Sequence, residues 1–127
     1  MDVALREALA QGEDEAALEL LRAHDSPEDT ELATLLLGVI VDPTRDDLLR
    51  QEAIIVVALS DAPVDSGAVV DAFLTAAEDD SWWPTQVEGL ERLGGRPLDN
   101  AARDRVRAIA EDDSQFELVR ESARRLL

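Results

Sequence analysis

The stretch Ala77–Ser81 reads AEDDS, and the same five residues return 33 positions later at Ala110–Ser114. Aromatic residues follow each copy. Trp82 and Trp83 come directly after the first, and Phe116 follows Gln115 after the second. Asp and Ser at such positions can accept hydrogen bonds from the exposed backbone N–H groups of a following helix. The repeated stretch therefore predicts an acidic turn that joins two helices in each of two copies of one structural unit.

Apolar residues recur with helical spacing along the chain. Leu32, Leu36 and Ile40 lie on one face of a helix, and the segments around Val70 and Val106 repeat that spacing. Proline, glycine and capping residues divide the pattern into eight expected helices, at about residues 2–11, 14–24, 28–41, 45–60, 66–78, 82–93, 99–111 and 115–127. No stretch alternates with the period of a β-strand, so the sequence predicts an all-α fold.

Several expected helix starts carry capping signals. Ser114 with Glu117 fits a capping box, and Thr44 with Asp47 fits a weaker version of it. Ser26–Pro27 fits an N-cap followed by proline at the first helical position. These signals place helix starts shortly after the acidic turns and after the connecting loop near residue 26.

A second pattern has the same period. Four segments share a spacing in which a polar residue is followed three positions later by a small residue and seven positions later by an apolar one. They are Arg50–Ala53–Val57, Gln86–Gly89–Leu93, Arg120–Ala123–Leu127 and, more faintly, Asp14–Ala17–Leu21. A small residue at the middle position allows two helices to approach closely. A period of about 35 residues built from helix pairs predicts an α-solenoid.

The segments DPTRDDLLRQEAIIVVAL (42–59) and EDDSQFELVRESARRLL (111–127) resemble HEAT repeats, which belong with the armadillo type of α-solenoid. The likeness consists of an Asp-containing turn, an apolar–Arg pair at the start of the second helix, and a small residue three positions after the Arg. The resemblance implies a right-handed α-α superhelix of about four antiparallel helix pairs. Its units would be about 1–24, 28–60, 66–93 and 99–127, within a single domain that spans residues 1–127.

The resemblance also implies a ladder of ion pairs between the turn and the second helix. Asp42 or Asp46 would pair with Arg50. Asp112 or Asp113 would pair with Arg120. In the third unit Gln86 and Gly89 replace the Arg and Ala, so the implied ladder is interrupted there.

The chain carries 29 acidic residues against 12 basic ones, all of them arginine, for a net charge of −17. This charge repels nucleic acid and anionic lipid, so neither is expected as a partner, whereas a basic protein would be attracted. Two other readings need no partner: a carboxylate shell of the kind found in proteins adapted to high salt, or a GC-rich genome that favours arginine codons. The charge is uneven, because residues 101–127 hold six acids and six bases.

Composition also limits the chemistry that the chain can carry. The absence of cysteine excludes disulfides, thiolate metal sites and cysteine nucleophiles. There is no glycine-rich phosphate loop, no H-x-x-x-H pattern, and a single histidine, His24, near an expected helix end. We therefore expect no enzyme activity, and assign no catalytic residue, no cofactor and no metal site. No apolar run could cross a membrane or serve as a leader, so we expect a cytoplasmic protein.

The expected partner-binding surface has two parts. Trp82 and Trp83 are half of the aromatic residues and would anchor a partner; alternatively, one ring fills a gap between helix pairs. Adjacent helical residues point about 100° apart, and we expect Trp83 to be the buried one because it falls near the Val87–Leu90 stripe. The second part is the solvent side of the second helices, which is also what an ordinary solvated face would present: Glu88, Glu91, Arg92, Glu117, Glu121 and Arg124.

These features favour a non-enzymatic protein–protein interaction module, a small acidic HEAT-like scaffold or adaptor. One alternative is an acidic inhibitor or immunity-type protein that neutralises a basic enzyme. A third resembles the bacterial HEAT-like lyase proteins, although the single histidine and the absence of Cys and Tyr argue against it. Leu126–Leu127 would leave an apolar side uncovered on the last helix, which predicts a homodimer through that helix.

Overall fold

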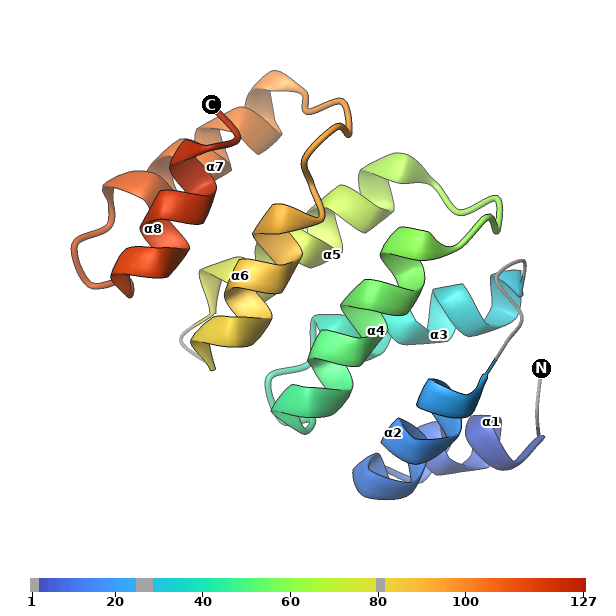
Figure 1. Ribbon diagram of the computed structural model, residues 1–127. Coiled ribbons are helices and arrows are strands. Elements are labelled where there is room, and N and C mark those ends of the chain that lie inside the picture. The colour runs from blue at the N-terminus through green and yellow to red at the C-terminus, as the bar shows by residue number, and fades with distance from the viewer. Residues whose placement is uncertain (1–2, 25–28, 80–81) are drawn as a thin grey trace.

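The computed structural model describes residues 3–24, 29–79 and 82–127. Within these residues the chain forms eight α-helices and no β-strand, which confirms the all-α prediction (Figure 1). The helices are α1 (Val3–Ala10), α2 (Asp14–Ala23), α3 (Thr30–Ile40), α4 (Asp47–Leu59), α5 (Ser66–Glu78), α6 (Trp83–Glu91), α7 (Asn100–Glu111) and α8 (Glu117–Arg124). Each lies inside one of the eight expected segments. The expected cap at Ser26–Pro27 lies outside the described residues.

The helices form two layers (Figure 1). Each of α1, α3, α5 and α7 packs against the helix that follows it in sequence. The even-numbered helices α2, α4, α6 and α8 also pack side by side in order, as do α3, α5 and α7. One layer therefore consists of the even-numbered helices, and the other of the odd-numbered ones.

The core between the layers is aliphatic. Leu36, Ile54 and Leu90 are fully buried, and Phe73 is the one aromatic among the buried described residues. All four residues of the segment 54–57 are β-branched, and the segment is helical. Gly89 lies at a close approach of α6 to α5, because a Cβ there would be 3.2 Å from the carbonyl oxygen of Phe73. This close approach is the role that the sequence predicts for a small residue at this position.

The two layers have two distinct edges. The helices α2, α4, α6 and α8 all begin at one edge, which we call the turn edge, and hydrogen bonds join their starts to one another. The helices α3, α5 and α7 begin at the opposite edge, which we call the connector edge (Figure 1). The acidic turns of the repeated pattern lie at the turn edge.

Candidate protein-binding site

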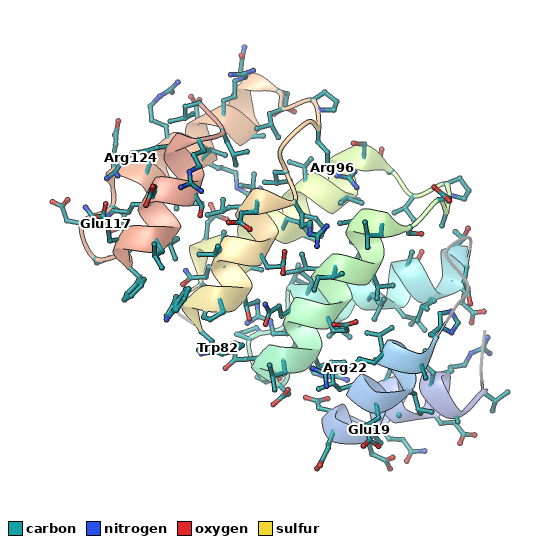
Figure 2. All side chains as sticks on the ribbon, viewed as in Figure 1. Glu19, Arg22, Trp82, Arg96, Glu117 and Arg124 are labelled. Atoms are coloured by element: carbon teal, nitrogen blue, oxygen red, sulfur yellow. The ribbon has the colours of Figure 1, made fainter. Side chains whose placement is uncertain are left out.

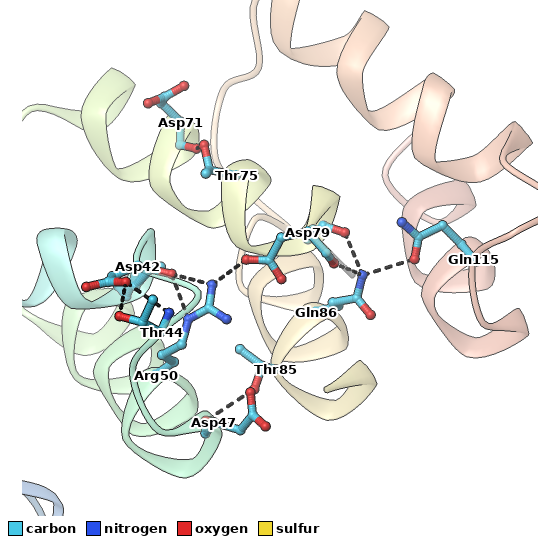
Figure 3. Close-up of polar contacts among 12 residues, drawn as sticks. Asp42, Thr44, Asp47, Arg50, Asp71, Thr75, Asp79, Thr85, Gln86 and Gln115 are labelled. Atoms are coloured by element: carbon cyan, nitrogen blue, oxygen red, sulfur yellow. Dashed lines mark hydrogen bonds and ion pairs between the residues drawn. The ribbon is translucent and has the colours of Figure 1, made fainter. Parts of the chain in front are cut away.

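The Arg50 side chain links the end of α3 to the turn that follows α5 (Figure 3). The side chain is fully buried, and its Nε and Nη2 donate to the carbonyl oxygen of Ile40 at 3.1 and 2.8 Å. Its Nη2 also donates to Asp79 Oδ2 at 2.6 Å. The expected pairing with Asp42 or Asp46 is wrong. Those two carboxylates are used locally, by Thr44 and by the backbone N–H of Leu49, and Arg50 reaches across to the following turn instead.

Gln86, an uncharged residue, links the turn after α5 to the turn before α8 (Figure 3). Its Nε2 donates to the carbonyl oxygens of Ala77 and Asp79, both at 2.8 Å, and to Gln115 Oε1 at 3.0 Å. The side chain thus does what Arg50 does: it binds the carbonyl end of the preceding helix and reaches into the next turn. The ladder is not interrupted at residue 86, as the resemblance implies, but passes through two buried amides.

Arg120 occupies the matching position on α8 and is bonded differently. It contacts the carboxylates of Asp113, at 3.5 Å, and Glu117, which confirms the pairing with Asp113. Its Nε is buried and has no hydrogen-bond acceptor among the described residues. Both carboxylates belong to the start of its own helix, so Arg120 strengthens the α7–α8 turn and does not bridge to another one.

Two of the acidic turns have the same hydrogen bonds. Asp42 Oδ1 accepts from the backbone N–H and the hydroxyl of Thr44 at 2.9 and 2.6 Å, and Asp112 Oδ1 accepts from Ser114 at the same two distances. The hydroxyl donors lower the pKa of both aspartates. Ser114 and Thr44 are therefore not the helix caps that the sequence predicts, because their side chains fold back into the turn.

The residues that cap the helices differ between the two edges. At the connector edge, Asp29, Asp65 and Asp99 each accept a hydrogen bond from the third residue of the helix, at 3.0, 3.1 and 2.8 Å. At the turn edge, Asp46 caps α4 in the same way, whereas the N-cap residues of α2, α6 and α8 are Glu13, Trp82 and Phe116, and none of their side chains makes a cap hydrogen bond. An indole or phenyl ring has no oxygen that could accept from the helix N–H groups.

The aromatic residues at these two starts form one exposed group, which we call the aromatic cluster: Trp82, Trp83 and Phe116. The rings of Trp83 and Phe116 stack with centroids 5.1 Å apart and an interplanar angle of 13°. Trp82 and Trp83 are each 39% exposed, and Phe116 is 51% exposed. The cluster lines a hollow of about 590 Å³, whose other walls are Gln86, Ser114, Gln115 and Glu117.

The prediction that Trp83 is the buried tryptophan is wrong. The buried face of α6 consists of Thr85, Gln86, Gly89 and Leu90, and Trp83 precedes it. Its ring stacks on Phe116 of the following helix pair and stays 39% exposed. Phe116 was not among the expected binding residues, although the sequence held a signal for it in the aromatic that follows each AEDDS stretch.

The charged residues of the expected surface do not form one group in the structure. Glu117 lies at the start of α8 and lines the hollow of the aromatic cluster; Figure 2 shows it at the turn edge with Trp82. Glu88 and Arg92 pair within α6 at 3.0 Å, and Glu121 pairs with Arg125 within α8. Glu91 and Arg124 are exposed farther along their helices, and Arg124 reaches back to Glu117 at 3.2 Å. Only Glu117 thus joins the tryptophans.

The turn edge is strongly acidic. Its described segments, 11–15, 41–48, 79, 82–83 and 112–117, contain ten carboxylates and a single arginine, Arg45. Arg45 is held by Asp14 at 2.8 Å and by the carbonyl oxygen of Leu9. Asp113 has a fully exposed side chain. The aromatic cluster lies at this acidic edge, although Arg120 and Arg124 pair with the carboxylates nearest to it, Asp113 and Glu117.

A second hollow, of about 500 Å³, lies between α5 and α7 and includes Arg105. Asp71 and Glu78 hold that guanidinium, so its positive charge is already neutralised. No group of three or more potential metal ligands occurs among residues 3–24, 29–79 and 82–127. Over the same residues, no helix is both long and apolar enough to span a membrane.

Comparison of the chain with protein-family models, with curated proteins and with solved structures found no match.

Proposed function

We propose that this protein is a non-enzymatic protein-interaction module, and that the aromatic cluster is its principal contact surface. The observation that carries the proposal is the placement of Trp82 and Phe116 at helix starts, where neither can cap and both remain exposed. Exposed tryptophan in a partly enclosed hollow is typical of residues that supply most of the free energy of a protein–protein contact.

We also propose the finer architecture, a HEAT-like right-handed superhelix of about four antiparallel helix pairs. The two-layer packing and the side-chain bridges between successive turns support it. In such an arrangement the even-numbered helices form one continuous face. The aromatic cluster lies at the border of that face, where it could contact a partner that lies along the helices.

A second candidate function, inhibition of a basic enzyme, is favoured by the acidity of the turn edge. If the acidity serves binding, the affinity for the partner should fall steeply with ionic strength, because exposed charges are screened over about 10 Å at 0.1 M salt. If the acidity serves only solubility in salt, the stability of the free protein should rise with molar KCl while its affinity changes little.

The proposal is tested by affinity capture from a native extract with the purified protein as bait. Wild type is compared with Trp82→Ala and with Leu59→Ala, which removes an even more exposed apolar side chain from the connector edge. We expect a retained protein that wild type and Leu59→Ala share and that Trp82→Ala loses. An identical set of retained proteins for all three baits would contradict the proposal.

A further inference from the structure

We infer that the aromatic cluster binds a cationic side chain, that of an arginine or a lysine, presented by an exposed segment of a partner protein. The inference rests on the proposed interaction function and adds the chemical class of the group that is recognised. It depends on three observations: exposed aromatic residues, a hollow with a carboxylate wall, and the acidity of the surrounding turns.

The ring faces supply the first part of the site. A guanidinium or ammonium over the face of tryptophan is attracted by the negative face of the ring. Trp82 and Trp83 both keep more than a third of their surface accessible, and Phe116 keeps half. The stack between Trp83 and Phe116 fixes the orientation of one tryptophan, because the two rings lie 5.1 Å apart and nearly parallel.

The carboxylates supply the second part. Glu117 forms one wall of the hollow, and Asp113 is adjacent to Ser114, which forms another part of the wall. Glu117 already accepts from Arg120 and Arg124. Asp113 has only a long contact of 3.5 Å with Arg120 and is fully exposed, so it is the acid best able to accept a new cation.

Other classes of ligand fit less well. An anionic group would be repelled by the ten carboxylates of the turn edge. A purely apolar side chain would cover the rings but would remove water from nearby carboxylates without offering them a donor, which is unfavourable. Arginine and lysine combine an apolar stem, which can lie against the rings, with a charged end that can reach the carboxylates.

The chain offers a direct measurement, because Trp82 and Trp83 are its only tryptophans. Intrinsic tryptophan fluorescence therefore reports on the aromatic cluster alone. The probes are a short Gly/Ser peptide that carries two adjacent arginines, the same peptide with lysines, and the same peptide with citrulline, which keeps the shape of arginine and lacks its charge. Each is titrated into the full chain at low ionic strength.

We expect saturable quenching with the arginine peptide, weaker binding of the lysine peptide, and roughly tenfold weaker binding of the citrulline peptide. Asp113→Asn should weaken the arginine peptide about threefold and leave the citrulline peptide unchanged. Asp104→Asn is the matched control, since it removes one exposed carboxylate from α7, away from the cluster, and it should leave both peptides close to wild type.

Three results would overturn the inference. They are equal affinity for the arginine and citrulline peptides, no fluorescence change with any peptide, and a fluorescence change that follows protein concentration together with a dimer in sedimentation. The last would assign the cluster to self-association. If the peptides fail while Trp82→Ala still loses a captured partner, the interaction function stands and only the cationic specificity is wrong. If capture is insensitive to Trp82→Ala, the proposed function itself fails.

Discussion

The two edges of the molecule begin their helices in different ways. At the connector edge, α3, α5 and α7 each start at an aspartate whose carboxylate accepts from the helix backbone. At the turn edge, α6 and α8 start at Trp82 and Phe116, and side chains such as Gln86 tie the helix starts to one another. At the connector edge α3, α5 and α7 are each stabilised by their own cap, whereas at the turn edge α4 alone among α2, α4, α6 and α8 has such a cap and side-chain bonds link neighbouring helix starts.

This difference separates local stability from surface chemistry. Replacing a capping side chain by one that cannot accept a hydrogen bond costs about 1 kcal/mol. Exposing three aromatic rings to water is a further departure from what stability favours. Departures from local preference tend to occur at functional sites, and here two of them fall beside each other. The comparison therefore supports the proposal that the turn edge is the side of the molecule that binds a partner.

The largest expected effect comes from breaking a connection at the turn edge. Arg50→Ala would leave the Ile40 carbonyl and the Asp79 carboxylate without their shared donor, and we expect a loss of about 3 kcal/mol in the free energy of unfolding. Urea denaturation measures it. Arg120→Ala is the matched control: its partners are exposed, so about 0.5 kcal/mol is expected. Equal losses would show that Arg50 does not link neighbouring turns.

The next effect concerns a cap at the connector edge. Asp99→Ala removes the acceptor for the Ala102 N–H at the start of α7, and we expect a loss of about 1 kcal/mol. The control, Asp104→Ala, changes an exposed aspartate within the same helix and should change stability by less than about 0.5 kcal/mol. Thermal and urea unfolding of the two variants should therefore differ. If they do not, the connector edge is not held by its caps.

A smaller effect of opposite sign is expected at the turn edge. Phe116→Asp places a capping carboxylate at the start of α8 and should stabilise the protein by about 0.5 kcal/mol, since the gained cap is partly offset by the lost stack on Trp83. The same variant should weaken partner binding. Urea midpoints and the capture assay measure the two properties. A variant that is less stable than wild type and still binds the partner would contradict the proposed difference between the two edges.

The smallest effect is a dependence on acid. Hydrogen bonds from Ser114 lower the pKa of Asp112 in the folded protein, so the carboxylate favours the folded state above its unfolded-state pKa. That contribution is lost as the pH falls through the lower folded-state pKa. Ser114→Ala should therefore reduce stability slightly at neutral pH and make the decline between about pH 4 and pH 2 shallower. Urea midpoints across that range should test this, with Ser66→Ala, at the connector edge, as control.

The local part of the structure was predictable. Helix periodicity depends on residues three and four apart, so helical segments such as Leu32–Ile40 can be recognised from the sequence alone. The small residue at Gly89 and the polar residues at positions 50 and 86 of the repeated spacing were likewise visible, and they mark the close helix approach and the positions of the ladder. The tryptophans at positions 82 and 83 could be singled out by their rarity.

What the sequence by itself determined is thus the set of helices, their period of about 35 residues, and the acidity of the turns, because all of these depend on near neighbours in the chain. Only the tertiary structure decided that Arg50 bonds to Asp79, that Gln86 bonds to Gln115, and that Trp83 lies exposed on Phe116. Partners 29 to 33 residues apart are brought together by the packing of neighbouring helices. Several acids compete for each arginine, and the distances that select among them exist only once the helices are packed.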